Sequence, residues 1–204
     1  MRGIYIQKRG ALMGKTFFIS DLHFGHKNCL IFDNRPFETI EEMNQKIITL
    51  WNNKVTSRDR VYLLGDVSWY NSEGSIEILG QLNGIKHLVK GNHDEWYGRI
   101  ESCYASISDY QEIKADGKDV VLCHYPIPLY NKHEYGAIHL YGHVHNAREY
   151  EVIRSFTQQL NSNGIHCHAI NVGCMMPYMN YTPRTLNQIR GDSHVNDIRN
   201  NIEN

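Results

Sequence analysis

Short runs rich in apolar residues alternate with helical patterns in the first half of the chain. Residues 16–20, 60–64 and 86–89 have the length and composition of buried strands. Residues 39–51 place apolar side chains three and four positions apart, as in an amphipathic helix, and residues 75–82 are consistent with a second helix. The order strand, helix, strand, helix, strand predicts crossover units in a layered α/β domain.

The second half of the chain continues with further strand patterns. Residues 110–126 predict two strands that are joined at Asp116-Gly117, a dipeptide typical of hairpin turns. Residues 138–145 and 166–173 predict two more strands, and the first of these ends in histidines. The whole chain is therefore expected to fold as a mixture of strands and helices.

A chain of 204 residues is long enough for one compact domain with a sizeable core. No internal repeat or linker divides it, and we predict a single domain over residues 15–190. Residues 1–14 lack a clear period and are expected to be an N-terminal extension, with Met13 as our hypothesis for the natural start. Residues 191–204 are expected to be a polar C-terminal tail.

Charge and cysteine content narrow the functional classes. The formal net charge of −1 shows no basic excess, which disfavours a nucleic-acid partner without excluding one. The number of cysteines, five, is odd, and the sequence contains no CxxC motif. We therefore expect the protein to lie in the reducing cytoplasm and to have no disulfide framework. No run approaches the roughly 18 apolar residues of a membrane span, and the start lacks a signal peptide's apolar core. We expect no membrane partner and make no prediction of oligomeric state.

Acidic, amide and imidazole side chains repeatedly follow the apolar runs. In the stretch FISDLHFGH, Asp21 and His23 end a buried strand, which fits a metal site, an acid-base pair or an ordinary polar loop. Functional groups of α/β sheets gather beyond the carboxyl ends of strands, so groups far apart in sequence could converge. The full set is Asp21, His23, Asp66, Asn92, His93, His124, His143 and His145.

Without His93, this set offers seven mixed oxygen and nitrogen ligands. Such ligands suit Mn, Fe or Zn better than Ca or Mg, which prefer oxygen alone. The absence of cysteine from the set argues against a closed structural zinc site. Seven ligands are too many for one tetrahedral ion and fit two ions if a carboxylate bridges them. Because positions i and i+2 share a face of an extended chain, Asp21 and His23 could bind one ion, and His143 and His145 could bind one or two.

Five short blocks occur in the order SDLHFGH, LLGDVS, VKGNHDE, LCHYPI and YGHVHN. Together they resemble the motifs of the calcineurin-like metallophosphoesterase superfamily over roughly residues 15–183, and they look most like its small stand-alone bacterial and phage-type members. The resemblance implies a four-layer α/β/β/α sandwich of two mixed sheets flanked by helices. It also implies a hydrolase with two divalent metal ions, for which we expect manganese, with iron, zinc or nickel as alternatives.

The resemblance also implies a role for each residue of the blocks. A water activated to hydroxide by the two metals would attack phosphorus in line. His93 would protonate the leaving oxygen, Asp94 is the nearest candidate to orient it, and Asn92 could also hydrogen-bond the phosphate. The first metal would be bound by Asp21, His23 and His145, the second by Asn92, His124 and His143, and Asp66 would bridge both.

The block that contains Asp66 departs from the protein Ser/Thr phosphatase branch of this superfamily. In that branch a second Asp and a phosphate-binding Arg follow, whereas Val67 and Ser68 follow here. The missing Arg argues against a phosphoprotein substrate, so we expect a small phosphoester, with a phosphodiester or nucleotide favoured. His26 and Tyr125 are our further candidates for contact with the substrate.

Two other functional classes remain as alternatives. A nuclease or nucleic-acid end-processing enzyme could use the same metal centre, although a short, nearly neutral chain leaves little room for a duplex-binding surface. A non-catalytic metal-binding scaffold is the second alternative, and the presence of every candidate ligand and of His93 argues against it. The histidines outside the blocks, such as His139, are expected to be structural.

Overall fold

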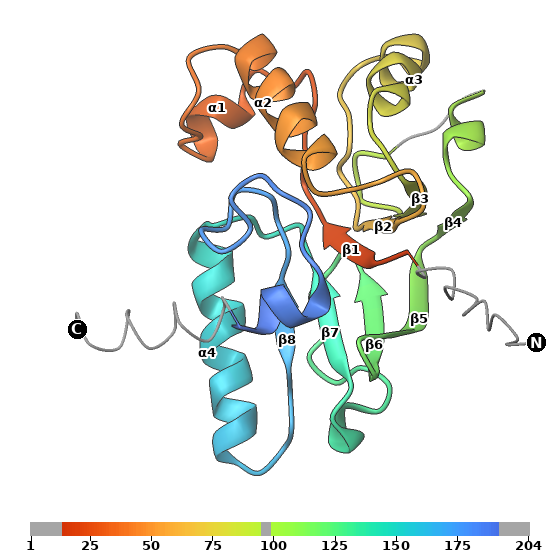
Figure 1. The fold of residues 1–204 in the computed structure, drawn as a ribbon. Helices are drawn as coiled ribbons and strands as arrows, with labels where there is room; N and C mark the ends of the chain where they lie inside the picture. The colour runs from red at the N-terminus through yellow and green to blue at the C-terminus, as the bar shows by residue number, and fades with distance from the viewer. Residues whose placement is uncertain (1–13, 95–98, 192–204) are drawn as a thin grey trace, which may run out of the picture.

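The computed structural model describes residues 14–94 and 99–191, and its strands form two four-stranded sheets (Figure 1). Within the first sheet all neighbouring strands pair in parallel. An antiparallel bridge between Phe18 and Arg184 adds a short segment at its edge and makes this sheet mixed. Its strand order is β1 (Thr16–Ile19), β2 (Arg60–Leu63), β3 (Ile85–Val89) and β4 (Ser106–Ser108).

The second sheet is also mixed. Its first two strands form the predicted antiparallel hairpin, and Asp116 and Gly117 both take the positive φ angles that such a tight turn requires. The other neighbours pair in parallel. The order is β5 (Tyr110–Ala115), β6 (Lys118–Cys123), β7 (Ile138–Tyr141) and β8 (Ala169–Asn171).

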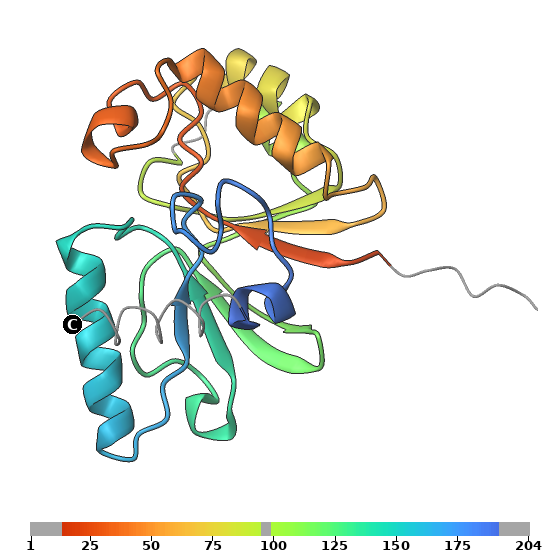
Figure 2. The ribbon, with the colours of Figure 1, turned by 60° about the vertical axis from the view of Figure 1, so that its left-hand side comes forward.

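Helices cover both outer faces of the paired sheets, which confirms the predicted sandwich. In Figure 2 the helices α2 and α3 lie above the first sheet and α4 lies beside the second. None of the helices in the described residues is long and apolar enough to cross a membrane. The α-helices are α1 (Cys29–Phe32), α2 (Ile40–Asn52), α3 (Ser72–Gly80) and α4 (Arg148–Ser162), and the 3₁₀ helices are Arg99–Cys103 and His133–Tyr135.

Helix α2 shows how the apolar pattern builds the core. The Thr39 side chain accepts a hydrogen bond from the backbone of Glu42 and so caps the helix at its start. Met43, Ile47 and Trp51 lie on one face of the helix and are fully buried. They belong to a hydrophobic cluster that also contains the buried apolar residues of β1, β2 and β3.

The two sheets are joined where β1 ends. The backbone N–H of Ser20 donates to the carbonyl of Val172 and its carbonyl accepts from Cys174, both at 2.9 Å. Gly142, which follows β7, comes so near that a Cβ there would lie 1.8 Å from Ser20 Oγ. This close approach requires glycine, and it brings the carboxyl ends of β1 and β7 to one place.

Two of the expected terminal features cannot be compared with this fold. The predicted N-terminal extension, including Met13, and the C-terminal tail lie outside the described residues, apart from Gly14 and Gly191. All five cysteines are free thiols.

His139 is a fully buried residue of β7 and has a structural role, as expected. Its Nδ1 donates to the carbonyl of Val121 at 3.1 Å, and its Nε2 accepts from the backbone N–H of Ile127 at 3.0 Å. Burial lowers the pKa of His139 to about 4, so the folded protein keeps this ring neutral in mildly acidic solution. The unfolded chain takes up the proton near the ordinary value of 6.5.

We therefore expect His139 to make stability depend on pH. Its contribution is complete above pH 6.5 and is lost as the pH falls toward 4, because only the unfolded state binds the proton there. Between pH 7 and pH 5 the free energy of unfolding should fall by about 2 kcal/mol more for the wild type than for His139→Gln. Urea unfolding at both pH values measures this, with the exposed His166→Gln as control. An equal loss in the wild type and His139→Gln would contradict it.

Candidate metal centre

The candidate ligands lie where β1, β2, β3, β6 and β7 end, and most of them have unusual backbone conformations. Left-handed φ angles between 47° and 71° occur at Asp21, His23, Asp66, His143 and His145. Residues other than glycine pay roughly 1–3 kcal/mol for such conformations, which persist only where the surroundings enforce them. Backbone strain is therefore concentrated at this site.

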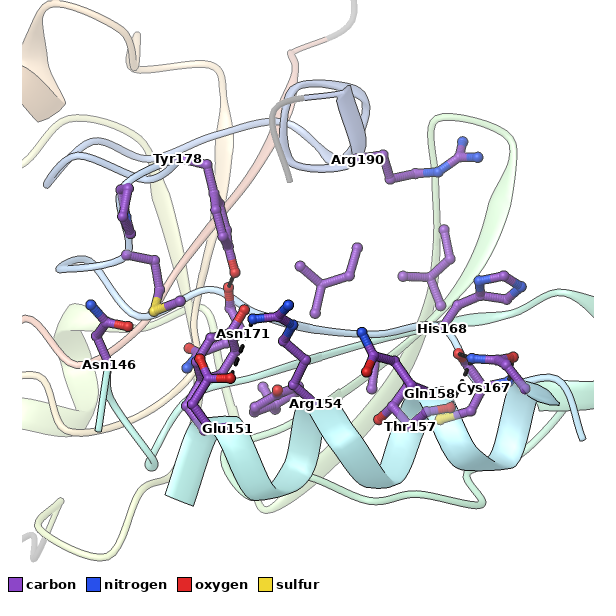
Figure 3. Close-up of a pocket in the computed structure, with 18 of the residues that line it drawn as sticks. Asn146, Glu151, Arg154, Thr157, Gln158, Cys167, His168, Asn171, Tyr178 and Arg190 are labelled. Atoms are coloured by element: carbon purple, nitrogen blue, oxygen red, sulfur yellow. Dashed lines mark hydrogen bonds and ion pairs between the residues drawn. The ribbon is translucent and has the colours of Figure 1, made fainter. Parts of the chain in front are cut away.

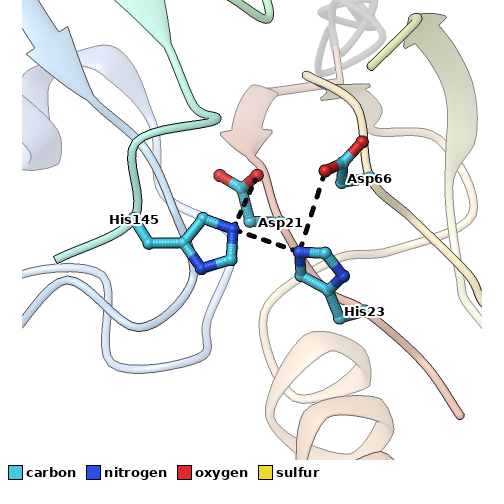
Figure 4. A group of neighbouring side chains, drawn as sticks. All are labelled: Asp21, His23, Asp66 and His145. Atoms are coloured by element: carbon cyan, nitrogen blue, oxygen red, sulfur yellow. Dashed lines mark hydrogen bonds and ion pairs between the residues drawn. The ribbon is translucent and has the colours of Figure 1, made fainter. Parts of the chain in front are cut away.

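Four of the side chains form one tight group (Figure 4). Each of Asp21, His23, Asp66 and His145 offers a ligand atom, and these atoms lie within 4.8 Å of one another. The Nε2 atoms of His23 and His145 are 3.1 Å apart. A carboxylate oxygen of Asp21 is 3.6 Å from His145 Nε2, and Oδ2 of Asp66 is 3.8 Å from His23 Nε2. This group could hold a metal ion.

The other carboxylate oxygen of Asp66 faces a second group. Its Oδ1 is 3.7 Å from His124 Nε2. The Oδ1 atom of Asn92 lies 3.1 Å from His124 Nε2 and 2.9 Å from His143 Nδ1. The structure thus brings all seven candidate ligands together in two groups that share Asp66.

Hydrogen bonds on the far side of two imidazoles aim their free nitrogens into the site. Nδ1 of His124 donates to the carbonyl of Leu64 at 2.7 Å, and Nδ1 of His145 donates to Asp33 Oδ1 at 2.6 Å. Because Nδ1 carries the proton in both rings, the Nε2 atoms of His124 and His145 are hydrogen-bond acceptors. They face other acceptors, the oxygens of Asn92 and Asp21 respectively. Lone pairs that converge without protons between them fit a cation, so the residues present suit metal ions.

Buried electrostatics support the same interpretation. Burial, followed by the charge of Arg35, lowers the pKa of His23 far below its usual range. Burial also lowers the pKa of His145, but the hydrogen bond to Asp33 and the charge of Asp21 outweigh it and raise that pKa. Because the two Nε2 atoms are only 3.1 Å apart, a positive charge on the His145 ring further lowers the pKa of His23.

Asp33 and Arg35 hold the group of Asp21, His23, Asp66 and His145 in place through hydrogen bonds. No role was predicted from the sequence for either residue. Arg35 is only 4% exposed, and its guanidinium donates to the carbonyls of Asp21 at 2.9 Å and Leu22 at 3.0 Å. It also donates to Asp33 Oδ2 at 2.8 Å, while the other oxygen of Asp33 holds His145. These contacts secure the strained backbone at Asp21 and the orientation of the His145 ring. Both residues lie in a polar loop, and no sequence signal distinguishes them.

Asp94 has partners other than the expected one. Its buried carboxylate accepts hydrogen bonds from the backbone N–H groups of Asp66 and Gly91 at 2.8 Å and of Val67 at 3.0 Å. Among the hydrogen bonds of the described residues, none joins Asp94 to the His93 ring. Adjacent side chains diverge here, and Asp94 holds the two loops that carry Asp66 and Asn92.

A cavity of about 540 Å³ opens beside the two groups and contains His93 and His26. The backbone N–H of His93 donates to Asp66 Oδ1 at 3.0 Å, and its exposed ring lies 4.3 Å from the ring of Trp69. His26 stacks flat on Trp69 at 3.9 Å, and its Nδ1 is 3.4 Å from Nδ1 of His23. His26 thus lies in the pocket and also contacts a candidate ligand.

Aromatic rings beside the two ligand groups add apolar surface. The ring of Tyr125 lies 4.7 Å from that of His143, at the edge of the second group. Phe32 is 56% exposed and Trp69 is 39% exposed, and both line the cavity. Neither Phe32 nor Trp69 was predicted from the sequence, because isolated aromatic residues outside the five blocks resemble ordinary packing residues.

Comparisons with known proteins identify relatives of this chain. A model of the calcineurin-like phosphoesterase superfamily domain matches residues 15–190. An uncharacterized protein of Methanocaldococcus jannaschii is 34% identical over 152 residues, which cover 73% of this chain and 81% of the relative. The Gene 66 protein of Mycobacterium phage D29 is 28% identical over 171 residues, covering 70% and 82% respectively.

A solved structure shows the same fold. A protein of unknown function from Aquifex aeolicus superposes with a TM-score of 0.67 at 25% sequence identity. The match covers 87% of this chain and 98% of that one.

The support by Asp33 leads to a test. We expect Asp33→Asn to lower the affinity for Mn²⁺ roughly 10- to 100-fold, because the neutral amide no longer fixes the tautomer and direction of the His145 ring. Titration calorimetry of the metal-free protein measures this, with circular dichroism to verify folding. Asp119→Asn is the matched control, since that carboxylate pairs with Lys114 and Lys132 elsewhere. An unchanged affinity in folded Asp33→Asn would show that Asp33 is not needed at the site.

Proposed function

The chain belongs to the calcineurin-like phosphoesterase superfamily, a family of hydrolases, and we propose that it cleaves a small phosphoester with the help of two divalent metal ions. The observation that carries this proposal is the position of Asp66. One oxygen of its carboxylate faces the nitrogen atom of His23 and the other faces that of His124. A carboxylate between two groups of ligand atoms is suited to bridge two ions.

The proposed ligands follow the two groups. The first ion would be held by Asp21, His23 and His145, the second by Asn92, His124 and His143, and both by Asp66. Mixed carboxylate, amide and imidazole ligands favour manganese, with iron, zinc or nickel as alternatives. Bound there, the ions would supply Lewis-acid activation of a water molecule and neutralise charge on the phosphate.

The chain itself supplies the proton and the positioning. We assign His93 the role of the acid that protonates the leaving oxygen, since its ring is exposed in the cavity beside the ligand groups. The hydrogen bond from the backbone N–H of His93 to Asp66 Oδ1 fixes the position of the His93 backbone beside the ligand groups. Asp94 holds the backbone of the two loops, and we propose that the amide of Asn92 contacts the phosphate.

The lining of the cavity favours a diester over a monoester. Among the described residues that line it, none is Lys or Arg, and Glu149 adds a negative charge. A phosphodiester carries one negative charge, whereas a monoester near neutral pH carries nearly two, and the described part of the lining offers that second charge no cation beyond the two proposed metal ions. The exposed faces of Phe32 and Trp69 suit an apolar or planar group on the ester. His26 and Tyr125 stay our candidates for contact with it.

The cysteines support a proposal for where the protein acts. All five are free, and four of them are buried. Free thiols persist most readily in a reducing compartment. We therefore propose a cytoplasmic location.

Activity assays with the loaded protein test the proposal. With Mn²⁺ we expect faster hydrolysis of bis-p-nitrophenyl phosphate than of p-nitrophenyl phosphate, because no Lys or Arg among the described lining residues can pair with the second charge of the monoester. Nucleotides with 2′,3′ and 3′,5′ cyclic phosphates and single-stranded DNA complete the panel. Turnover of DNA alone would favour the nuclease alternative. The absence of turnover with Mn²⁺, Fe²⁺, Ni²⁺ and Zn²⁺ would remove the enzymatic proposal for simple esters.

The role of His93 has a separate signature. We expect His93→Ala to retain two metal ions per chain and to lose roughly 10²- to 10⁴-fold in kcat, because only the acid is removed. Metal content by mass spectrometry and kcat are measured together, with the exposed His166→Ala as control. Asp66→Asn should instead lose both activity and metal. Loss of both metals from His93→Ala would show that His93 is not the acid.

A further inference from the structure

A second cavity, of about 620 Å³, lies between α4 and the second sheet (Figure 3). Its floor is formed by apolar residues of the sheet, among them Ile138, Ala169 and Ile170. No described residue lines both this cavity and the one at the candidate metal centre. Its volume is typical of sites for small organic ligands, which span roughly 300–1,000 Å³.

The face of α4 that covers this floor is polar in its middle. Arg154, Thr157 and Gln158 are one turn apart and line the cavity. Tyr150 and Leu160, toward the two ends of the helix, pack against the core clusters, and no residue of α4 is fully buried. A helix that only covered a sheet would turn apolar residues inward along its whole length. The polar middle of α4 therefore spans an open space above an apolar floor.

The charges around the cavity are mostly positive. Lys118, Arg154 and Arg190 line it, and Glu151 is the one carboxylate among the described lining residues. Nη1 of Arg154 donates to that carboxylate at 3.2 Å, and Figure 3 shows the Arg154 side chain rising from α4 into the space. The described lining residues thus carry an excess of fixed positive charge.

From the apolar floor and the excess positive charge, we propose that this cavity binds a small organic anion. The ligand has a flat or aliphatic body, which rests on Ile138, Ala169 and Ile170. Its carboxylate, phosphate or sulfonate group meets Arg154, with Thr157 and Gln158 as hydrogen-bonding neighbours. The proposal does not depend on the reaction at the metal centre.

The far end of the cavity contacts the support of the candidate metal centre. Asn171 lines the cavity, and its side chain donates to the carbonyl of His145 at 2.8 Å. The hydroxyl of Tyr178 donates to the carbonyl of Asn171 at 2.5 Å. A small molecule bound in the cavity would therefore contact Asn171 but none of the side-chain atoms that are candidates to coordinate a metal ion.

A fluorescent anion of this shape tests the site directly. The probe is 8-anilinonaphthalene-1-sulfonate, which joins an aromatic body to one sulfonate, and it is titrated into the full-length, Mn-loaded protein. We expect saturable binding of one molecule per chain. Arg154→Gln should weaken it at least 10-fold, and Ala169→Phe, which fills the floor, should abolish it. The uncharged N-phenyl-1-naphthylamine should bind more weakly and should not respond to Arg154→Gln.

Two control variants distinguish binding in this cavity from binding elsewhere on the protein. Arg60→Gln removes an exposed cation at the start of β2 and should leave the affinity for the probe unchanged. Asp66→Asn disturbs the metal centre and should also leave it unchanged. Circular dichroism establishes that each variant is folded. No saturable binding, equal binding to folded Arg154→Gln and the wild type, or loss of binding in Asp66→Asn would each overturn the proposal.

Discussion

The hydrogen bonds between Ser20 and the chain around Val172 hold the molecule together at its functional end. They attach the residue that follows β1 to the chain that follows β8, so the ends of strands from both sheets meet at one point. Gly142 permits the approach, since any side chain there would collide with Ser20 and Asp21. Without this junction, the carboxylates of the first sheet and the histidines of the second would have no common site.

Once the strands end together, the chain must turn its polar side chains inward within one or two residues. It does so through left-handed conformations at Asp21, His23, Asp66, His143 and His145, which are costly for side chains of this size. Buried polar groups hold these turns. Arg35 bonds the carbonyl of Asp21, Asp94 bonds the backbone of Asp66, and Asn171 bonds the carbonyl of His145. The geometry of the site thus depends as much on these three residues as on the ligands themselves.

The fold and the family were predictable because apolar runs, turn residues and five ordered blocks each leave a local signal, and the family model and the two sheets confirm them. The meeting of Asp21 with His143 was predictable only as a consequence of strand ends. Asp33 and Arg35 were missed because a supporting ion pair in a loop looks like any solvated pair. The partners of Asp94 depend on rotamers that no sequence pattern reports. Helix α4 was missed because its inward face is polar where a covering helix is normally apolar.

The separation of the ligands along the chain has one more consequence. Asp21 and His143 are 122 residues apart in sequence and belong to different sheets, so the complete set of ligand atoms exists only after both sheets have formed. An ion that binds the complete set therefore binds the folded chain and not the unfolded one. By mass action, a free metal concentration one hundred times the dissociation constant adds about 2.7 kcal/mol to stability. The concentration of free metal would then set the stability of the folded protein as well as its activity.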